Sequence, residues 1–450
     1  MNTFFSKYLI LILLLAQTGC TTYAQFTGDF RSQVANKDYT QALENLNDAK
    51  KGNNKLLYLL ETGLIAHYQK QYEKSNRYFA EAEKHADELF TKSISRQAAS
   101  LITNDAIKNY KGESFELVAI HYYRALNYWY LGLPEDALVE CRKANLKLAQ
   151  YAIHNGETSY KNDAFIHYMT GLFYEATGEY NDAYISYQHA QDAYTHYTAV
   201  FEVLSPQALE KDLQRVSDIL NGVEVASLNV TSLSSPVGNG ELVIFSEIGF
   251  VPRKVQEEID LPLYTNDIKR SKNVETTVLA KDISNRRYHG QNHGNVDYWL
   301  RVALPKYDVT PPQTFTTSIS TGGQQTQTVL AQNYAGIAKA SLSDHYPGIL
   351  TKTTARAFVK YVTYLKAKKE NKVLGFFTNL FNVSTEIADT RSWVSLPNNI
   401  QIGRLTLPPG KHTITIEAHD KNGNITATET LENIEVKPGQ RTFISHRFYR

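Results

Sequence analysis

Two kinds of hydrophobic pattern divide the 450-residue chain. Up to about residue 222, small and aromatic residues recur at helical spacing; beyond it, apolar and polar residues alternate, as they do in strands. The stretch GLFYEATGEYNDAYISYQHA (171–190) shows the first pattern. Its key residues fall on an expected helix, a turn and a second helix: Gly171, Tyr174, Gly178, Ala183, Tyr187 and Ala190. This arrangement predicts a pair of antiparallel helices with small residues where they cross.

The same pattern occurs at 124–145, at 63–86 and, as a partial copy, at 36–50. These copies resemble tetratricopeptide repeats, which have a period of about 34 residues. The spacing here is irregular, because extra helical sequence separates the copies. We therefore expect a degenerate array of paired helices over residues 20–222.

In arrays of this kind the concave face binds a partner. The first helix of each expected pair would line that face. The predicted partner-binding residues are His121, Tyr122, Asn127, His167 and Tyr168. The alternative for the aromatic residues is packing in the core, since stacked helices need apolar faces.

Residues 223–450 are expected to form a β-rich domain. Segments 242–250, 298–305 and 314–320 have the character of strands, and the pattern is clearest from 400 to 449. There, DKNGN (420–424) supplies the residues of a hairpin turn. The sequence thus predicts an α+β protein: a helical tetratricopeptide-like solenoid followed by an antiparallel, sandwich-like β domain.

A helical insert is expected within the β domain at about 331–387, with Pro347 near its first turn. Its last part is a basic run followed by the apolar segment KVLGFFTNLFNV (372–383). A basic stretch ahead of an apolar helix suits a membrane surface. A helical hairpin packed on the sheet requires fewer assumptions, and we prefer it.

The first twenty residues, MNTFFSKYLILILLLAQTGC, have the form of a signal peptide. The apolar run after Lys7 is too short to cross about 30 Å of hydrocarbon. Gly19 before Cys20 resembles a bacterial lipobox, so we expect residues 1–19 to be removed and Cys20 to carry the lipid. Gln17 departs from the usual apolar residue, and two alternatives stay open: cleavage after Ala24, or an uncleaved anchor. All three outcomes take the chain out of the cytoplasm.

Charge and cysteine content limit the classes of partner and of reactive site that the sequence supports. The 47 Lys and Arg residues nearly balance the 46 Asp and Glu residues, for a net charge of +1. Such a balance gives no reason to expect a nucleic-acid partner. The second cysteine, Cys141, falls on the apolar stripe of an expected helix, which indicates a small buried side chain.

Motifs for common catalytic and cofactor sites are absent from the sequence, including GxSxG, HExxH, GxxxxGK[ST] and GxGxxG. We therefore predict no catalytic residue, no cofactor and no metal. His289, His293 and Asp297 lie four residues apart, but the surrounding glycines favour a loop over a helical metal site. In DTRSWVSLP (389–397), Asp389 and Arg391 are expected to pair and fix a corner before a strand.

An enzyme is the main alternative, and a hydrolase of wall glycan would use paired carboxylates. The carboxylates available in the C-terminal half are Glu247, Glu257, Glu258, Asp260, Asp389 and Glu417. A second alternative is a surface protein that binds glycan or a protein. Sequence spacing does not decide which carboxylates meet.

The layout of lipobox, paired helices and the segments ELVIFSEIGFVPRK and ADTRSWVSLP resembles an uncharacterised family of bacterial envelope lipoproteins. The resemblance implies a lipid-anchored protein of the cell envelope, at the outer membrane and facing the periplasm. It also implies a setting in cell-wall assembly. The expected function is a non-enzymatic adaptor that binds other envelope proteins through its helices, with the membrane and the cell wall as further partners.

Overall fold

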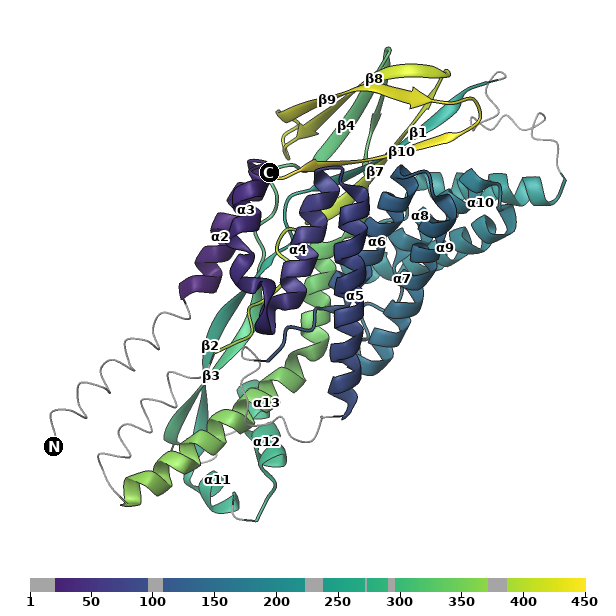
Figure 1. The fold of residues 1–450 in the computed structure, drawn as a ribbon. Helices are drawn as coiled ribbons and strands as arrows, with labels where there is room; N and C mark the ends of the chain where they lie inside the picture. Colours follow the sequence, from purple (N-terminus) through teal and green to yellow (C-terminus); the bar gives the residue numbers. More distant parts are fainter. Residues whose placement is uncertain (1–20, 96–107, 223–237, 272, 290–295, 371–386) are drawn as a thin grey trace.

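A computed structural model describes residues 21–95, 108–222, 238–271, 273–289, 296–370 and 387–450. The protein is of the α+β class, as predicted. Within these residues, most helices lie in the N-terminal half and all strands in the C-terminal half (Figure 1). Three further helices accompany a long hairpin that extends away from the rest of the molecule.

Pairs of antiparallel helices build the N-terminal half, and α4 packs on α5, α6 on α7 and α8 on α9. The pairing rests on close approach at glycine: a Cβ on Gly171 would lie 2.4 Å from the ring of Tyr187. Gly178, at the turn that follows, has φ +84°, a conformation that favours glycine. The helices are α2 (Thr21–Ala35), α3 (Tyr39–Asn45), α4 (Lys55–Tyr68), α5 (Tyr72–Ser95), α6 (Ser114–Tyr130), α7 (Pro134–Asn155), α8 (Ala164–Thr177), α9 (Tyr180–Phe201) and α10 (Gln207–Leu220).

The partial copy at 36–50 differs from the others. Only the seven-residue α3 forms there, followed by short 3₁₀ turns at Asn47–Lys50 and Gly52–Asn54. Its apolar side chains Ala42 and Leu46 pack with Phe30 and Val34 of α2. In this shorter pair, α3 is therefore the second helix and α2 the first.

Two four-stranded sheets pack face to face. The first, sheet A, has the order β10-β1-β7-β6, and the second, sheet C, has the order β5-β4-β8-β9. Against the expectation of a purely antiparallel sandwich, β1 pairs with β10 in parallel. The strands are β1 (Gly240–Ile248), β4 (Thr316–Thr321), β5 (Gln324–Gln327), β6 (Val329–Asn333), β7 (Asn399–Leu407), β8 (Gly410–His419), β9 (Ile425–Val436) and β10 (Arg441–Phe448).

Sheet A is buried on both faces. Alternate side chains of a strand point to opposite sides, so one strand can contribute to two cores. Val243 and Phe245 of β1 belong to the large core shared with the helices. Leu242 and Ile244 of the same strand belong to the core shared with sheet C. The helical array therefore forms one layer on sheet A, and sheet C forms the other.

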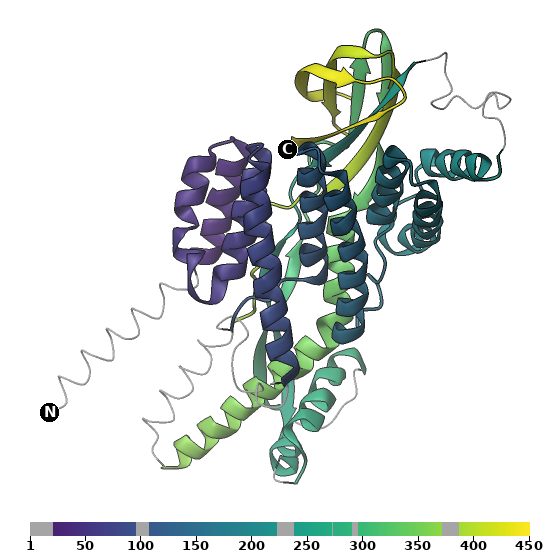
Figure 2. The same ribbon diagram turned by 45° about the vertical axis from the view of Figure 1, so that its right-hand side comes forward.

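The remaining elements form what we call the arm: the hairpin of β2 (Arg253–Tyr264) and β3 (Val296–Asp308), with α11 (Thr265–Arg270), α12 (Thr276–His289) and α13 (Tyr334–Glu370) (Figures 1 and 2). It has its own small core of β2, β3, α12 and α13 side chains. Within the insert, α13 packs on β3, and the rest of the expected helical hairpin lies outside the described residues. The expected start at Pro347 is wrong, because α13 begins at Tyr334 and continues through this proline. The apolar segment 372–383 lies outside the described residues, which stop at Glu370 and resume at 387.

Candidate functional site

The face of α4, α6 and α8 that was expected to bind a partner is covered by the chain's own sheet A. Side chains of all three helices share one core with β1, β7 and β10. Of the five predicted partner-binding residues, four are buried; His167 is partly exposed. The expectation of an open concave groove is corrected: what lies in the groove is the C-terminal half of the same chain.

Two of the five predicted residues contact the C-terminal half directly. The Tyr122 hydroxyl donates to Glu247 of β1 over 3.1 Å. The Tyr168 hydroxyl accepts a hydrogen bond from Nη1 of Arg404 on β7 over 3.0 Å and donates to Asp212 of α10 over 3.0 Å. These tyrosines bind within the molecule and are not available to a separate partner.

The other three predicted residues join neighbouring helices. His121 lies 2.7 Å from Glu140 of α7, and Asn127 lies 2.6 Å from His67 of α4. His167 lies 3.4 Å from Asn145 of α7. These contacts hold neighbouring helices together.

A segment that we call the strap, residues 388–398, enters the groove just before β7. Glu61 of α4 accepts the backbone N–H of Val394 over 2.9 Å, and Glu116 of α6 accepts that of Trp393 over 2.7 Å. Glu61 also accepts the Ser395 hydroxyl. The indole of Trp393 is fully buried against Phe79 and Tyr123.

Burial governs the ionisation of these two carboxyl groups. It raises the pKa of Glu61 to about 8. Burial, followed by the charge of Glu113, raises the pKa of Glu116 to about 7. A carboxyl group in such a place costs free energy unless it is hydrogen-bonded. The strap amides supply that bond, so helices and strap depend on each other.

At the start of the strap, Arg391 forms two hydrogen bonds to Asp389, of 2.8 and 2.7 Å. Its guanidinium also donates to the carbonyl oxygens of Asn53 and Lys108 in the helical half. The expected Asp–Arg pair at this corner is therefore present. Its further contacts, to the helical half, were not predicted.

Glu247, one of the carboxylates available to an enzyme, lies in the middle of this interface. It accepts hydrogen bonds from the hydroxyls of Tyr68, Tyr122 and Tyr123, at 2.7, 3.1 and 3.2 Å. Burial raises its pKa, and Arg447 opposes that rise. Three donors from two helices fix the carboxylate of a strand, which is a structural role.

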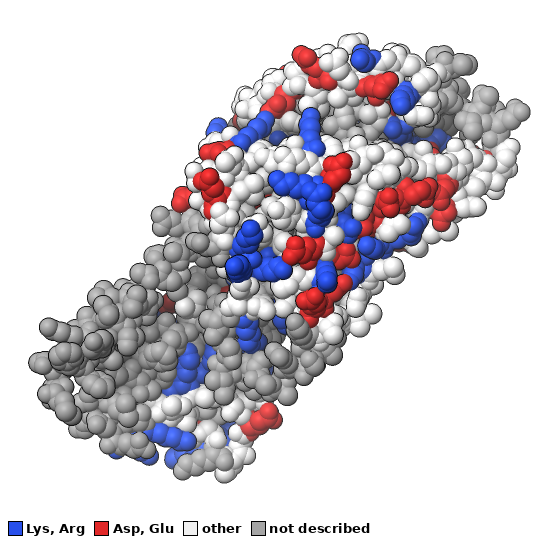
Figure 3. Space-filling view, in the orientation of Figure 1, with Lys and Arg blue, Asp and Glu red and all other residues white. Residues whose placement is uncertain are grey.

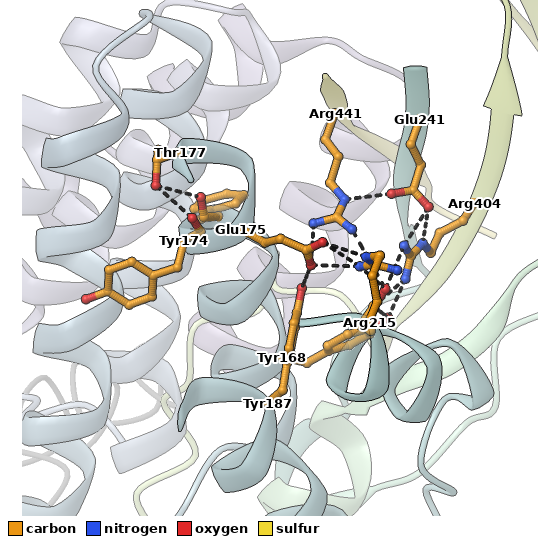
Figure 4. A network of polar contacts seen from close by, with 11 residues as sticks. Tyr168, Tyr174, Glu175, Thr177, Tyr187, Arg215, Glu241, Arg404 and Arg441 are labelled. Atoms are coloured by element: carbon orange, nitrogen blue, oxygen red, sulfur yellow. Dashed lines mark hydrogen bonds and ion pairs between the residues drawn. The ribbon is translucent and has the colours of Figure 1, made fainter. Parts of the chain in front are cut away.

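A cluster of three carboxylates and three guanidinium groups closes the other end of the interface (Figure 4). Arg441 of β10 contacts Glu175 of α8 at 2.8 Å and Glu241 of β1 at 2.6 Å. Arg404 contacts Glu241 at 2.6 Å through Nε, and Arg215 of α10 contacts Glu175. All six residues are buried or nearly so: Glu175, Asp212, Arg215, Glu241, Arg404 and Arg441.

The cluster is electrically balanced, and the balance decides the protonation of its members. Burial by itself would raise the pKa of Asp212, but Arg404, Arg215 and Arg441 outweigh burial and hold that pKa well below its ordinary value. At Glu241, Arg404 and Arg441 likewise outweigh burial and lower the pKa. The cluster therefore joins α8 and α10 to three strands through charges that compensate one another.

The remaining carboxylates available to an enzyme do not meet in a cleft within the described part of the chain. Glu257, Glu258 and Asp260 lie along β2 and pair with Lys306 or Arg301 of β3. Asp389 is held by Arg391, and Glu417 lies on sheet C beside Ser318. A shallow hollow of about 600 Å³ borders α5, but none of these five residues lines it.

One group of side chains has the ligand types of a metal site. Atoms of Glu83, His121 and Glu140 lie within 4.8 Å of one another. However, Arg124 already contacts Glu83 at 2.6 Å and Glu140 at 3.1 Å, so a guanidinium supplies the positive charge there. His289 is the last residue of α12 and Asp297 lies in β3, whereas His293 and the glycine-rich segment expected as a loop lie outside the described residues.

On the outside of the helical array, α7 carries a row of exposed apolar side chains. Val139, Leu146 and Ile153 are 38, 71 and 85% exposed and recur every seven residues. This spacing places them on one face of the helix, about 10.5 Å apart per step. We call this row the α7 stripe.

Sequence reasoning missed Glu61, Glu116 and the six-residue cluster. A signal was present for the first two: each is the single carboxylate in an apolar helical run, KLLYLLETGLIAHY and SFELVAIHYY. A lone acid in such a run must be buried with a partner or exposed by a break in the pattern. The expected burial of Cys141 is confirmed, at 1% exposure.

Comparison of the chain with family models, with curated proteins and with solved structures yields no match. Cys20 lies outside the described residues, which begin with α2 at Thr21. Among the described helices, none combines the length and apolar character needed to traverse a bilayer.

Proposed function

We propose that this protein is a lipid-anchored, non-enzymatic scaffold of the bacterial cell envelope. In this proposal Cys20 carries the lipid, the paired helices are a tetratricopeptide-like array, and the protein binds another envelope protein, in the setting of cell-wall assembly. The observation that carries the proposal is the α7 stripe, because the concave groove is filled by the protein's own strands.

The α7 stripe suits an amphipathic helix of the partner. Apolar residues at seven-residue intervals form the seam along which two helices pack. Docking of a helix on an apolar row is a common mode of peptide recognition. Side chains as exposed as Leu146 and Ile153 would be removed from water by such a partner.

The rigid interface between helices and sheet A supports a holding role. A helical array fixed to a sandwich by buried ion pairs presents its outer face in one geometry. A lipid tether then raises the local concentration of the protein at the membrane, which strengthens weak contacts with partners there. The enzymatic alternative gains no support from the described residues, since its carboxylates are held in separate structural contacts.

Site-specific photo-crosslinking in membranes tests the proposal. A photoreactive residue at Leu146 should give a defined crosslinked species, and Ile153→Ser should reduce its yield. The matched control carries the photoreactive residue in place of Ile425, a side chain of β9 that is 56% exposed. Equal crosslinking at Ile425, or none at Leu146, would reject the α7 stripe as the binding face. Palmitate labelling of the intact chain and of Cys20→Ala tests the anchor separately.

A further inference from the structure

The distal half of the arm has a charge very different from that of the whole chain. We define it as residues 265–289 with 349–370, which cover α11, α12 and the second part of α13. These residues include twelve Lys or Arg and four Asp or Glu, a net charge of +8, whereas the whole chain has +1. The positive charge of the protein is thus concentrated here, and the remainder is net acidic.

Each ion pair inside this set uses one base and one acid, so such pairs leave its net charge of +8 unchanged. Arg286 contacts Asp267 at 2.6 and 2.8 Å, and Arg270 contacts Asp282 at 2.7 Å. These contacts use two of the four acids. Near the end of α13, Lys366, Lys368 and Lys369 are all exposed. Figure 3 shows blue side chains over this lower end of the molecule, where red ones are sparse.

Exposed apolar side chains accompany the charge. Val278 of α12 is 50% exposed, and Val296 and Trp299, at the start of β3, are 39 and 57% exposed. The indole of Trp299 is on the opposite face of β3 from Leu300, which is buried in the arm core. Tryptophan is enriched at the membrane–water interface, where its ring is both apolar and polar in character.

The arm lies on the side of the molecule from which the N-terminal end of α2 emerges. The start of α2 at Thr21 follows Cys20 directly, and in Figures 1 and 2 this end of α2 points down toward the side on which α13 ends. In this proposal the tether leaves the molecule on the same side as the arm.

We propose that the distal half of the arm is a second membrane contact, which binds an anionic bilayer surface. Lysines near such a surface gain free energy from its negative potential. The apolar side chains of Val278, Val296 and Trp299 would enter the headgroup region. The contact restricts the rotation that a single lipid tether allows, so the α7 stripe is held at a fixed orientation to the membrane.

This contact extends the proposed lipid anchor, but its test does not depend on acylation. Binding to vesicles is measured with the full Cys20→Ala chain, which has no lipid. Vesicles of phosphatidylcholine alone report any contribution from the apolar leader, by which we mean residues 1–19. Vesicles that also contain phosphatidylglycerol report the anionic contribution. We expect clear binding to the anionic vesicles that weakens as salt is added.

The combined variant Lys366→Gln, Lys368→Gln and Lys369→Gln should weaken binding to anionic vesicles at least roughly tenfold. Trp299→Ala should weaken it further. The matched control is Lys411→Gln, Lys421→Gln and Lys437→Gln, which removes the same charge from exposed positions at the sandwich end. The control should bind as the parent does.

Three results would overturn the proposal. Equal binding to neutral and anionic vesicles would assign the contact to the leader. Equal loss in the control variant would show that only net charge matters. Binding to soluble polyglutamate without binding to vesicles would make the ligand an acidic polymer. If the arm fails in this assay while Cys20 is still labelled with palmitate, the lipid anchor stands without the second contact.

Discussion

The carboxylate of Glu61 in α4 accepts the backbone amide of Val394 over 2.9 Å, although 333 residues separate the two in sequence. The donor belongs to the strap and the acceptor to the helical array. Main-chain recognition of this kind is how a groove holds an extended segment of another protein. Here the groove holds a segment of its own chain, which moves partner binding to the outer face.

Replacement of Glu61 by leucine should destabilise the fold strongly. The change leaves the Val394 amide and the Ser395 hydroxyl buried without an acceptor, at a cost of about 1–3 kcal/mol each. Chemical denaturation of the purified protein measures the loss. Glu88→Leu, at an exposed position on α5, serves as the control. If both variants unfold at the same denaturant concentration, the strap contact has no energetic weight.

Stability should depend on pH through Glu61. Its folded pKa of about 8 exceeds the unfolded value of 4.5, so between these values the folded state holds a proton that the unfolded state has lost. The free energy of unfolding therefore falls as pH rises through this window. Buried histidines oppose the trend at lower pH, since burial lowers the pKa of His67, His167 and His446 to about 4 from 6.5.

The window for this test is pH 6.5 to 8, where the histidines contribute least. Glu116, whose pKa is raised to about 7 by burial, titrates in the same window and in the same direction. Glu61 alone should account for a fall in unfolding free energy of about 1.5 kcal/mol across this window. In Glu61→Gln, which does not titrate, the profile should be flatter. A wild-type profile that rises with pH, or one that Glu61→Gln leaves unchanged, would contradict the assignment.

Arg441→Met should be among the most destabilising single changes. It removes the partner of Glu175 and Glu241 and leaves excess negative charge in a buried cluster, at about 3–5 kcal/mol. The double variant Arg441→Met with Glu241→Met should regain part of the loss, because charge balance returns. Thermal unfolding measures both. The exposed Arg301→Met should leave the midpoint unchanged, and a loss equal to that of Arg441→Met would count against the cluster.

Gly171→Ala tests the close approach of α8 and α9. The added Cβ would lie 2.4 Å from the ring of Tyr187, which is fully buried and whose hydroxyl donates to Glu175. Overpacking of this kind costs about 1–3 kcal/mol, which exceeds the gain in helix propensity. At Gly348 of α13 a Cβ meets nothing within 4 Å, so Gly348→Ala should stabilise by about 0.5–1 kcal/mol. The calorimetric midpoints of the two variants should move in opposite directions.

The paired helices and the turn at 420–424 could be predicted from the sequence, because their signals lie within a few neighbouring residues. Paired helices follow from small residues at crossings, as Gly171 against Tyr187 shows. The turn at 420–424 follows from side-chain chemistry, since Asp420 accepts the amides of Asn422 and Asn424. By contrast, β2 carries many charged residues on its outer face and was not predicted as a strand.

The site was less predictable than the fold, because its contacts join residues far apart in sequence. His121, Tyr122 and Tyr168 were correctly placed on first helices, yet no local feature indicated that strands of the same chain would cover them. The parallel pairing of β1 with β10 brings the end of the chain beside Glu241 and completes the cluster. Such a pairing is decided by tertiary packing, which alternation along a strand does not encode.

The central claim, that the groove is filled by the chain itself, is tested most directly by hydrogen exchange at the strap. The amides of Trp393 and Val394 are donors to buried carboxylates, so they should exchange only when the whole protein unfolds. Mass spectrometry of strap peptides should then give the same opening free energy as α6, with and without membranes present. Fast exchange at these two amides in the folded protein would mean that the groove opens to other ligands, and would contradict the account.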